Sequence, residues 1–123
     1  MVGGIHHLAI LCSGRESLRF YEALGFAVYE THERPERGDC IYLMRGNGLT
    51  LELFIAPGHP ARVTAPEAYG LRHLALHVAD AEQAAERLRR AGYAPEPIRR
   101  DNFTGEKMTF VKDPDGQPVE LHE

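Results

Sequence analysis

The chain has 123 residues, of which 43% are hydrophobic and 26% are charged, and its formal net charge at pH 7 is -4. This length and balance are typical of one globular domain with its own core, and the lack of a broad basic surface argues against a nucleic-acid partner. No apolar run approaches the roughly 20 residues of a membrane helix, and the first residues do not resemble a secretory signal. We therefore expect a cytoplasmic protein with no membrane partner and with Cys12 and Cys40 as free thiols.

The first half of the chain predicts one strand, one helix and three further strands. The helix is expected at about residues 14–24, with Ser13 as its N-cap and Gly25 as its stop signal. A turn at Arg45-Gly46-Asn47-Gly48 joins the last two strands, and Pro57 to Pro66 predicts a linker. The four strands are expected at about residues 5–12, 26–33, 39–45 and 49–55.

The second half predicts the same order of elements. Its helix is expected at about residues 81–91, capped by Asp80 and stopped by Gly92. The turn Asp113-Pro114-Asp115-Gly116 is expected to reverse the chain before the last strand. The four strands are expected at about residues 71–78, 95–100, 106–112 and 117–122.

Short motifs recur between the two halves. His7-Leu8-Ala9-Ile10 returns 66 residues later as His73-Leu74-Ala75-Leu76, and Leu51-Glu52-Leu53 returns 68 residues later as Val119-Glu120-Leu121. Such a repeat constrains the architecture before any single element is assigned. The fold class is predicted to be α+β, with two tandem βαβββ modules and one helix covering each curved sheet. The repeats are expected at about residues 5–56 and 71–123 of a single domain, 1–123.

Glu52 and Glu120 interrupt strands that are otherwise apolar. A carboxylate taken out of water without a partner costs several kcal/mol, so buried acids are normally paired or bound to a metal. Alternation along the first strand puts His6 and His7 on opposite faces, and the repeat selects His7 because it matches His73. Two imidazoles and two carboxylates at matched positions predict a site for one divalent cation. The alternative is that both glutamates lie on solvent-facing strand surfaces.

In this order the motifs resemble the vicinal-oxygen-chelate superfamily, which includes glyoxalase I, methylmalonyl-CoA epimerase, extradiol dioxygenases, and fosfomycin and bleomycin resistance proteins. The resemblance covers nearly the whole chain and implies the glyoxalase/bleomycin resistance/dihydroxybiphenyl dioxygenase fold and a homodimer. Pro66-Glu67-Ala68 and Phe103-Thr104-Gly105 look closest to a small bacterial subgroup typified by YaeR. The motifs that carry the resemblance are His-His-Leu-Ala-Ile, Arg-Phe-Tyr-Glu-Ala-Leu-Gly-Phe, Leu-Glu-Leu-Phe, Gly-Leu-Arg-His-Leu-Ala-Leu, and Asp-Pro-Asp-Gly followed by Val-Glu-Leu.

The resemblance also implies a metal-dependent lyase or isomerase that moves a proton next to a carbonyl of a small vicinal-oxygen substrate. It assigns the metal ligands to the first and fourth strands of each module, which are His7 and Glu52, then His73 and Glu120. This mixed set suits Ni, Co, Mn or Zn better than Ca. Similarity to glyoxalase I nominates Glu120 first and Glu52 second as general acid/base residues. The ligands could come from one chain or from two.

The match to glyoxalase I weakens where glutathione would bind. Glutathione-dependent members carry an Arg four residues after the first ligand and an Asn four residues after the second, but Leu11 and Ala56 stand here. A glutathione hemithioacetal, and hence lactoylglutathione lyase activity, is therefore not expected. The residues nominated for substrate contacts are His77, Arg99 and Lys107, with Arg100 as a further cation.

Two other functions stay open. An epimerase of an acyl-thioester would use the same fold, metal and base, whereas a metal-free, drug-sequestering protein of the bleomycin resistance type would lack the ligand set. Tyr21 and Phe54 are expected to pack in the core. His32, His59 and His122 have no repeat partner and are expected at the surface.

Overall fold

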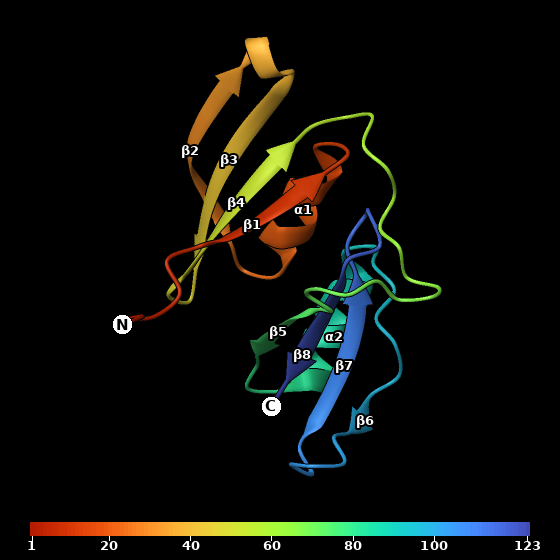
Figure 1. The fold of residues 1–123 in the computed structure, drawn as a ribbon. Helices are drawn as coiled ribbons and strands as arrows, with labels where there is room; N and C mark the ends of the chain where they lie inside the picture. Colours follow the sequence, from red (N-terminus) through yellow and green to blue (C-terminus); the bar gives the residue numbers. More distant parts are fainter. The chain divides into compact units, whose positions relative to one another are not determined.

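The computed structural model describes every residue from Met1 to Glu123. The chain divides into two compact units, Met1–Pro60 and Ala61–Glu123. Each unit holds one four-stranded mixed sheet with one α-helix against it (Figure 1). This confirms the predicted α+β class with tandem βαβββ modules. Neither helix has the length and hydropathy needed to cross a bilayer.

The first unit has the strand order β1-β4-β3-β2, in which β1 runs parallel to β4 and the other neighbours are antiparallel. Asn47 and Gly48 have φ values of 49° and 79°, as the two central residues of a type I′ hairpin turn require, so the predicted turn is confirmed. The elements are β1 (Leu8–Cys12), α1 (Glu16–Ala23), β2 (Ala27–Arg34), the 3-10 helix η1 (Pro35–Arg37), β3 (Asp39–Gly46) and β4 (Leu49–Ile55).

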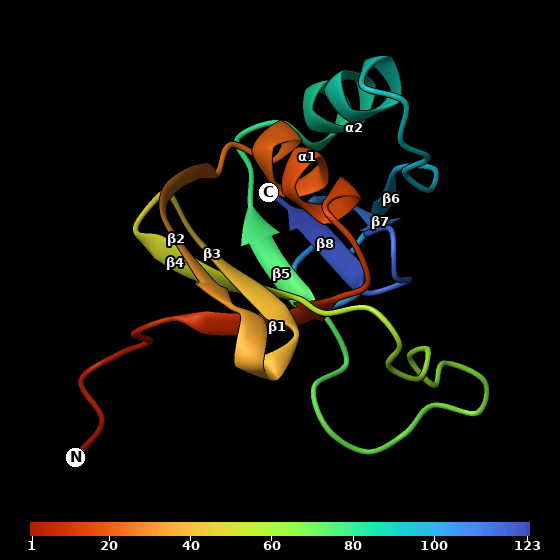
Figure 2. The same cartoon turned by 90° about the horizontal axis from the view of Figure 1, so that it is seen from above.

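Helix α1 covers one face of this sheet, as Figure 2 shows from above. Phe20 and Tyr21 on α1 are fully buried, as are Leu51 and Leu53 on β4, and this confirms the core position predicted for Tyr21. The helix begins later than predicted. Its N-cap is Arg15, which makes no side-chain capping bond, so the expectation of Ser13 as N-cap is wrong.

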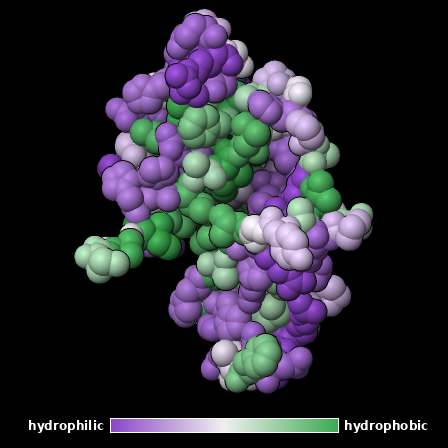
Figure 3. Space-filling model, viewed as in Figure 1, coloured by the Kyte–Doolittle hydropathy of each residue, from purple (hydrophilic) through white to green (hydrophobic).

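The other face of the first sheet carries no helix, and we call it the helix-free face. Along β4, Leu51 and Leu53 point to α1, so Glu52 and Phe54 lie on the helix-free face. Phe54 is half-buried there beneath the guanidinium of Arg34, whose Cζ lies 5.3 Å from the ring centroid. Phe54 is therefore not part of the helix-covered core, contrary to the prediction. Hydrophobic surface gathers over the strands of this unit in Figure 3.

The second unit has the strand order β5-β8-β7-β6, and β5 runs parallel to β8. Asp80 caps α2 by accepting a hydrogen bond from the backbone N–H of Gln83 at 2.9 Å, which confirms the predicted cap. Gly92, at φ 93°, follows the C-cap Ala91. The elements are β5 (Leu74–His77), α2 (Ala81–Arg90), β6 (Arg99–Arg100), β7 (Lys107–Lys112) and β8 (Pro118–His122).

Strand β6 is much shorter than the predicted strand at residues 95–100. Pro95 and Pro97 have no N–H to give to a strand ladder, so regular pairing starts only at Arg99. Glu96 still ties this segment to β7, because its N–H donates to the Phe110 carbonyl at 2.8 Å and its carbonyl accepts from the Thr109 hydroxyl at 2.7 Å.

The two faces of the second sheet also differ. Leu88 of α2 is buried, and Thr109 and Val111 of β7 and Leu121 of β8 are buried with it on the helix-covered side. The residues that alternate with these form the helix-free face. It comprises Ala75 and His77 of β5, Met108 and Phe110 of β7, and Glu120 and His122 of β8.

Candidate functional site

The first unit brings His7 and Glu52 together. His7 directly precedes β1, and Glu52 lies on the neighbouring β4, in register with Ala9. His7 Nε2 lies 3.1 Å from Glu52 Oε2, with 41% of the histidine side chain and 24% of the glutamate side chain exposed. The other ring nitrogen of His7 is 2.8 Å from Nδ1 of His6. His6, which the sequence placed on the opposite face, therefore contacts and orients the His7 ring.

The second unit brings His73 and Glu120 together in the same way. His73 directly precedes β5, and its Nε2 lies 2.8 Å from Glu120 Oε2 on β8. This pair is less exposed than the first, at 26% for His73 and 10% for Glu120. The His73 ring also meets the Phe110 ring edge to face, with centroids 5.1 Å apart. The four expected ligands thus form two like pairs, one in each unit.

The geometry of each pair fits two ligands of one transition-metal ion. Imidazole nitrogen and carboxylate oxygen bind such ions at about 2.0–2.2 Å, so two adjacent ligand atoms are about 3 Å apart. The facing atoms are 3.1 Å apart in the first pair and 2.8 Å apart in the second. Each pair supplies one nitrogen and one oxygen, a donor set suited to first-row divalent ions.

The nominated substrate residues do not all lie on the face of Glu120. His77 is exposed and in register with His122 on that face, and Arg99 pairs with Met108 there. Lys107 does not belong to it. Its ammonium lies 3.1 Å from the Glu82 carboxylate of α2, on the helix-covered side, because alternation along β7 turns it away from Glu120.

His122 is half-buried on the helix-free face, with 21% of its side chain exposed, so the surface position expected for it is wrong. Its Nδ1 donates to the Glu123 carbonyl at 2.7 Å, and its Nε2 lies 3.3 Å from Asp101 Oδ2. The Glu123 carbonyl, followed by Asp101, raises the pKa of His122. The alternation of side chains along β8 could have predicted this position, because His122 lies two residues beyond Glu120 and therefore on the same face of the strand.

Asp101 belongs to the same cluster. Its Oδ1 accepts hydrogen bonds from the backbone N–H groups of Phe103 at 2.6 Å and Thr104 at 3.0 Å, and these donors hold the pKa of Asp101 below its usual range. Ligand atoms of Asp101, Glu120 and His122 all lie within 4.8 Å of one another. The second unit thus contains a compact acidic and imidazole group around Glu120.

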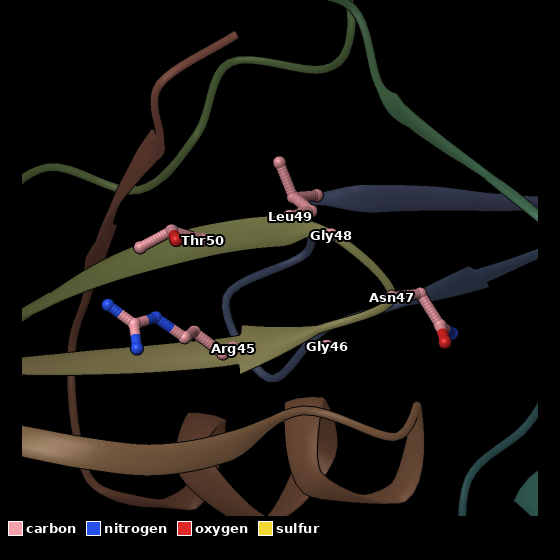
Figure 4. A pocket seen from close by; sticks show the side chains of 6 residues that line it. All are labelled: Arg45, Gly46, Asn47, Gly48, Leu49 and Thr50. Atoms are coloured by element: carbon pink, nitrogen blue, oxygen red, sulfur yellow. The ribbon is translucent and has the colours of Figure 1, made fainter.

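A pocket of about 330 Å³ lies at the β3–β4 hairpin (Figure 4). Its lining runs from Arg45 to Thr50, and Asn47 points outward from the turn. Thr50 shares the helix-free face with Glu52, two residues further along β4. The pocket therefore borders the strand that carries Glu52, but none of the four expected ligands lines it.

Two bacterial proteins are similar to this chain over nearly their whole length. The uncharacterized protein YwkD of Bacillus subtilis (strain 168) is 45% identical over 126 residues, covering 100% of this chain and 98% of that protein. The uncharacterized protein YaeR of Escherichia coli (strain K12) is 39% identical over 122 residues, covering 97% and 95%. The expected likeness to the YaeR subgroup is thereby confirmed.

Solved structures and a family model agree with these relatives. A glyoxalase family protein from Enterococcus faecalis superposes with a TM-score of 0.92 at 46% identity, covering 98% of both chains. The trypanothione-dependent glyoxalase I of Leishmania major superposes with a TM-score of 0.72 at 28% identity, covering 99% of this chain and 87% of that one. A family model spans residues 4–121. The chain therefore belongs to the Glyoxalase/Bleomycin resistance protein/Dioxygenase superfamily.

Proposed function

We propose that this protein is a metal-dependent lyase or isomerase of the glyoxalase I type, acting on a small substrate with vicinal oxygens. The observation that carries the proposal is the recurrence of one His–Glu pair in each unit, at 3.1 Å and 2.8 Å, on matched positions of the repeat. The likeness to the glyoxalase I of Leishmania major supports the same class of reaction.

In this proposal the four residues of the two pairs hold one divalent ion, which is Ni, Co, Mn or Zn. When bound, such an ion supplies Lewis-acid chemistry toward two neighbouring substrate oxygens. The proposal also includes a homodimer, because each sheet leaves strand edges and a helix-free face for a partner. A cytoplasmic location is part of the same proposal. The four ligands are His7, Glu52, His73 and Glu120.

Glu120 is the first choice for the base and Glu52 the second. The Glu120 side chain is 10% exposed against 24% for Glu52, so fewer waters compete for its oxygens. Glu120 takes a proton from the carbon beside the substrate carbonyl and returns it to the neighbouring carbon, which gives isomerisation without net oxidation. His73, 2.8 Å away, holds the carboxylate in position.

The substrate is not expected to be a glutathione adduct. Leu11 is 51% exposed and lies in register with Phe54 on the helix-free face, where glutathione-dependent relatives would carry an arginine. Ala56 is 7% exposed and stands where they would carry an asparagine. Neither side chain can bind a carboxylate or an amide.

The test combines metal analysis with an activity screen. Purified protein should bind one divalent ion for every two His–Glu pairs, that is, one ion per chain. The metal-loaded protein should isomerise the methylglyoxal hemithioacetals of small thiols in preference to the hemithioacetal of glutathione. Glu120→Gln should lower kcat by at least about a hundredfold, the usual contribution of a general base. Glu106→Gln, a change at an exposed glutamate, should leave kcat unchanged.

Other results would point elsewhere. Protein that neither retains nor takes up a divalent ion would favour the metal-free binding protein of the bleomycin resistance type. Turnover confined to acyl-thioesters, with exchange of the proton beside the thioester carbonyl, would favour the epimerase. Equal activity in Glu120→Gln and Glu106→Gln would remove Glu120 as the base.

A further inference from the structure

The second unit contains an arginine that no acid neutralises. Of the three cations considered from the sequence, Lys107 pairs with Glu82 at 3.1 Å, and Arg100 donates from Nη1 to the Gly105 carbonyl at 2.8 Å. Arg99 is exposed, and none of the ion pairs of the second unit includes it. It also lies on the helix-free face, since its partner in the ladder is Met108, whereas Arg100 pairs with Lys107 on the other side.

Two contacts hold the Arg99 guanidinium in place without using its terminal nitrogens. Nε donates to the sulfur of Met108 at 3.2 Å, and Cζ lies 5.6 Å from the centroid of the Phe110 ring. A guanidinium over the face of an aromatic ring is attracted by the negative charge of that face. Both Nη groups are left as donors without an acceptor in the structure.

Phe110 links this cation to the proposed metal ligands. Its ring meets the His73 ring at 5.1 Å, and the residue itself is in register with Glu120 on β8. Arg99 therefore lies one aromatic ring away from the His73–Glu120 pair. A small substrate held at that pair would reach Arg99 with any group that extends across Phe110.

The acid nearest to Arg99 along the sequence, Asp101, already has other partners. Its Oδ1 accepts from the backbone N–H groups of Phe103 and Thr104, and its Oδ2 lies 3.3 Å from His122 Nε2.

The first unit offers a contrast. Arg34 also lies over an aromatic ring, that of Phe54, but Asp39 binds its guanidinium through two hydrogen bonds of 2.7 Å and 2.6 Å. Arg34 is thus neutralised by Asp39, whereas Arg99 is left with its charge unpaired. Arg45, whose Cζ lies 3.8 Å from the centroid of the Tyr29 ring, also has no acid partner, but it lines the pocket at the β3–β4 hairpin, where none of the four expected ligands lies.

We propose that Arg99 binds a carboxylate of the substrate, and that the substrate is a vicinal-oxygen compound bearing a carboxylate in addition to its chelating oxygens. This inference rests on the proposed function. A guanidinium with two free Nη groups presents the fork that matches two carboxylate oxygens. Arg99 is thus a specificity-determining residue and takes no part in the proton transfer.

Binding of small chelators to Co-loaded protein tests this without any activity assay. Acetohydroxamic acid offers vicinal oxygens alone, and the monohydroxamates of malonic, succinic and glutaric acid add a carboxylate at increasing reach. Calorimetric Kd values are measured for the wild-type protein, for Arg99→Met, which keeps most of the apolar stem, and for Arg100→Met as the matched control. Arg99→Lys keeps the charge but loses the fork.

In the wild-type protein at least one monohydroxamate should bind about tenfold or more tighter than acetohydroxamic acid, as one charged hydrogen-bonded contact provides. Arg99→Met should abolish this preference, Arg99→Lys should restore part of it, and Arg100→Met should retain it. Three outcomes would overturn the role of Arg99 but leave the proposed metal site intact. They are retention of the preference in Arg99→Met, an equal loss of it in Arg100→Met, and the absence of any preference in the wild-type protein. Failure of acetohydroxamic acid itself to bind would overturn the metal site and the Arg99 proposal together.

Discussion

Substitutions at two neighbouring residues of β4, Glu52 and Leu53, should change activity and stability separately, because the two side chains lie on opposite faces of the sheet. Leu53 is fully buried against α1, and Glu52 pairs with His7 on the helix-free face. Leu53→Ala removes buried methyl groups and leaves a cavity, which costs about 2–5 kcal/mol. At about 4 °C or more per kcal/mol for a unit of this size, a loss of about 3 kcal/mol lowers the Tm by about 12 °C.

Glu52→Gln should behave in the opposite way. The His7–Glu52 pair is 41% and 24% exposed, and solvent-accessible ion pairs contribute only about 0–1 kcal/mol, so the Tm of the metal-free protein should change by a few degrees at most. Activity of the metal-loaded protein should instead fall by about a hundredfold or more, as for loss of a ligand or a base.

Thermal unfolding followed by circular dichroism on metal-free protein, together with kcat/KM on metal-loaded protein, measures both effects. Leu121→Ala and Glu120→Gln form the matched pair in the second unit, where Leu121 is 1% exposed and Glu120 lies on the opposite face. A Glu52→Gln variant that lowers the Tm as much as Leu53→Ala, or a Leu53→Ala variant whose Tm stays within about 2 °C of wild type, would contradict this assignment of the two faces.

Three further predictions concern metal binding, caps and charges. Adding the cognate ion at 100 times its Kd should stabilise the protein by about 2.7 kcal/mol, and a chelator should reverse the Tm shift. Asp80→Ala should lower the free energy of unfolding in urea by about 1 kcal/mol because α2 loses its side-chain cap, whereas Asp80→Asn, which keeps the acceptor, should lower it less. Arg34 lowers the pKa of Asp39 in the folded protein, so their stabilisation is present above the unfolded pKa of about 3.9 and is lost as pH falls through the folded pKa. The difference in urea midpoint between wild type and Asp39→Asn should therefore shrink below about pH 4, and a constant difference down to pH 2 would contradict this assignment.

Much of this architecture follows from local sequence. The two-fold order of elements, the Asn47-Gly48 turn and the Asp80 cap depend on residues a few positions apart, so their signals can be read along the chain. The pairing of each His with its Glu was also predictable, because the repeat marks equivalent positions and alternation puts each residue on a defined face.

Tertiary structure decided what depends on partners far apart in the sequence. Lys107 and Arg99 look alike as cations, but strand register sends Lys107 to Glu82 on α2 and leaves Arg99 stacked on Phe110. His122 has no repeat partner, and its half-buried position arises from Asp101, 21 residues away. A local pattern gives the period of a strand, but only the packed helix and the neighbouring strands determine which face each residue shares and which charges remain unpaired.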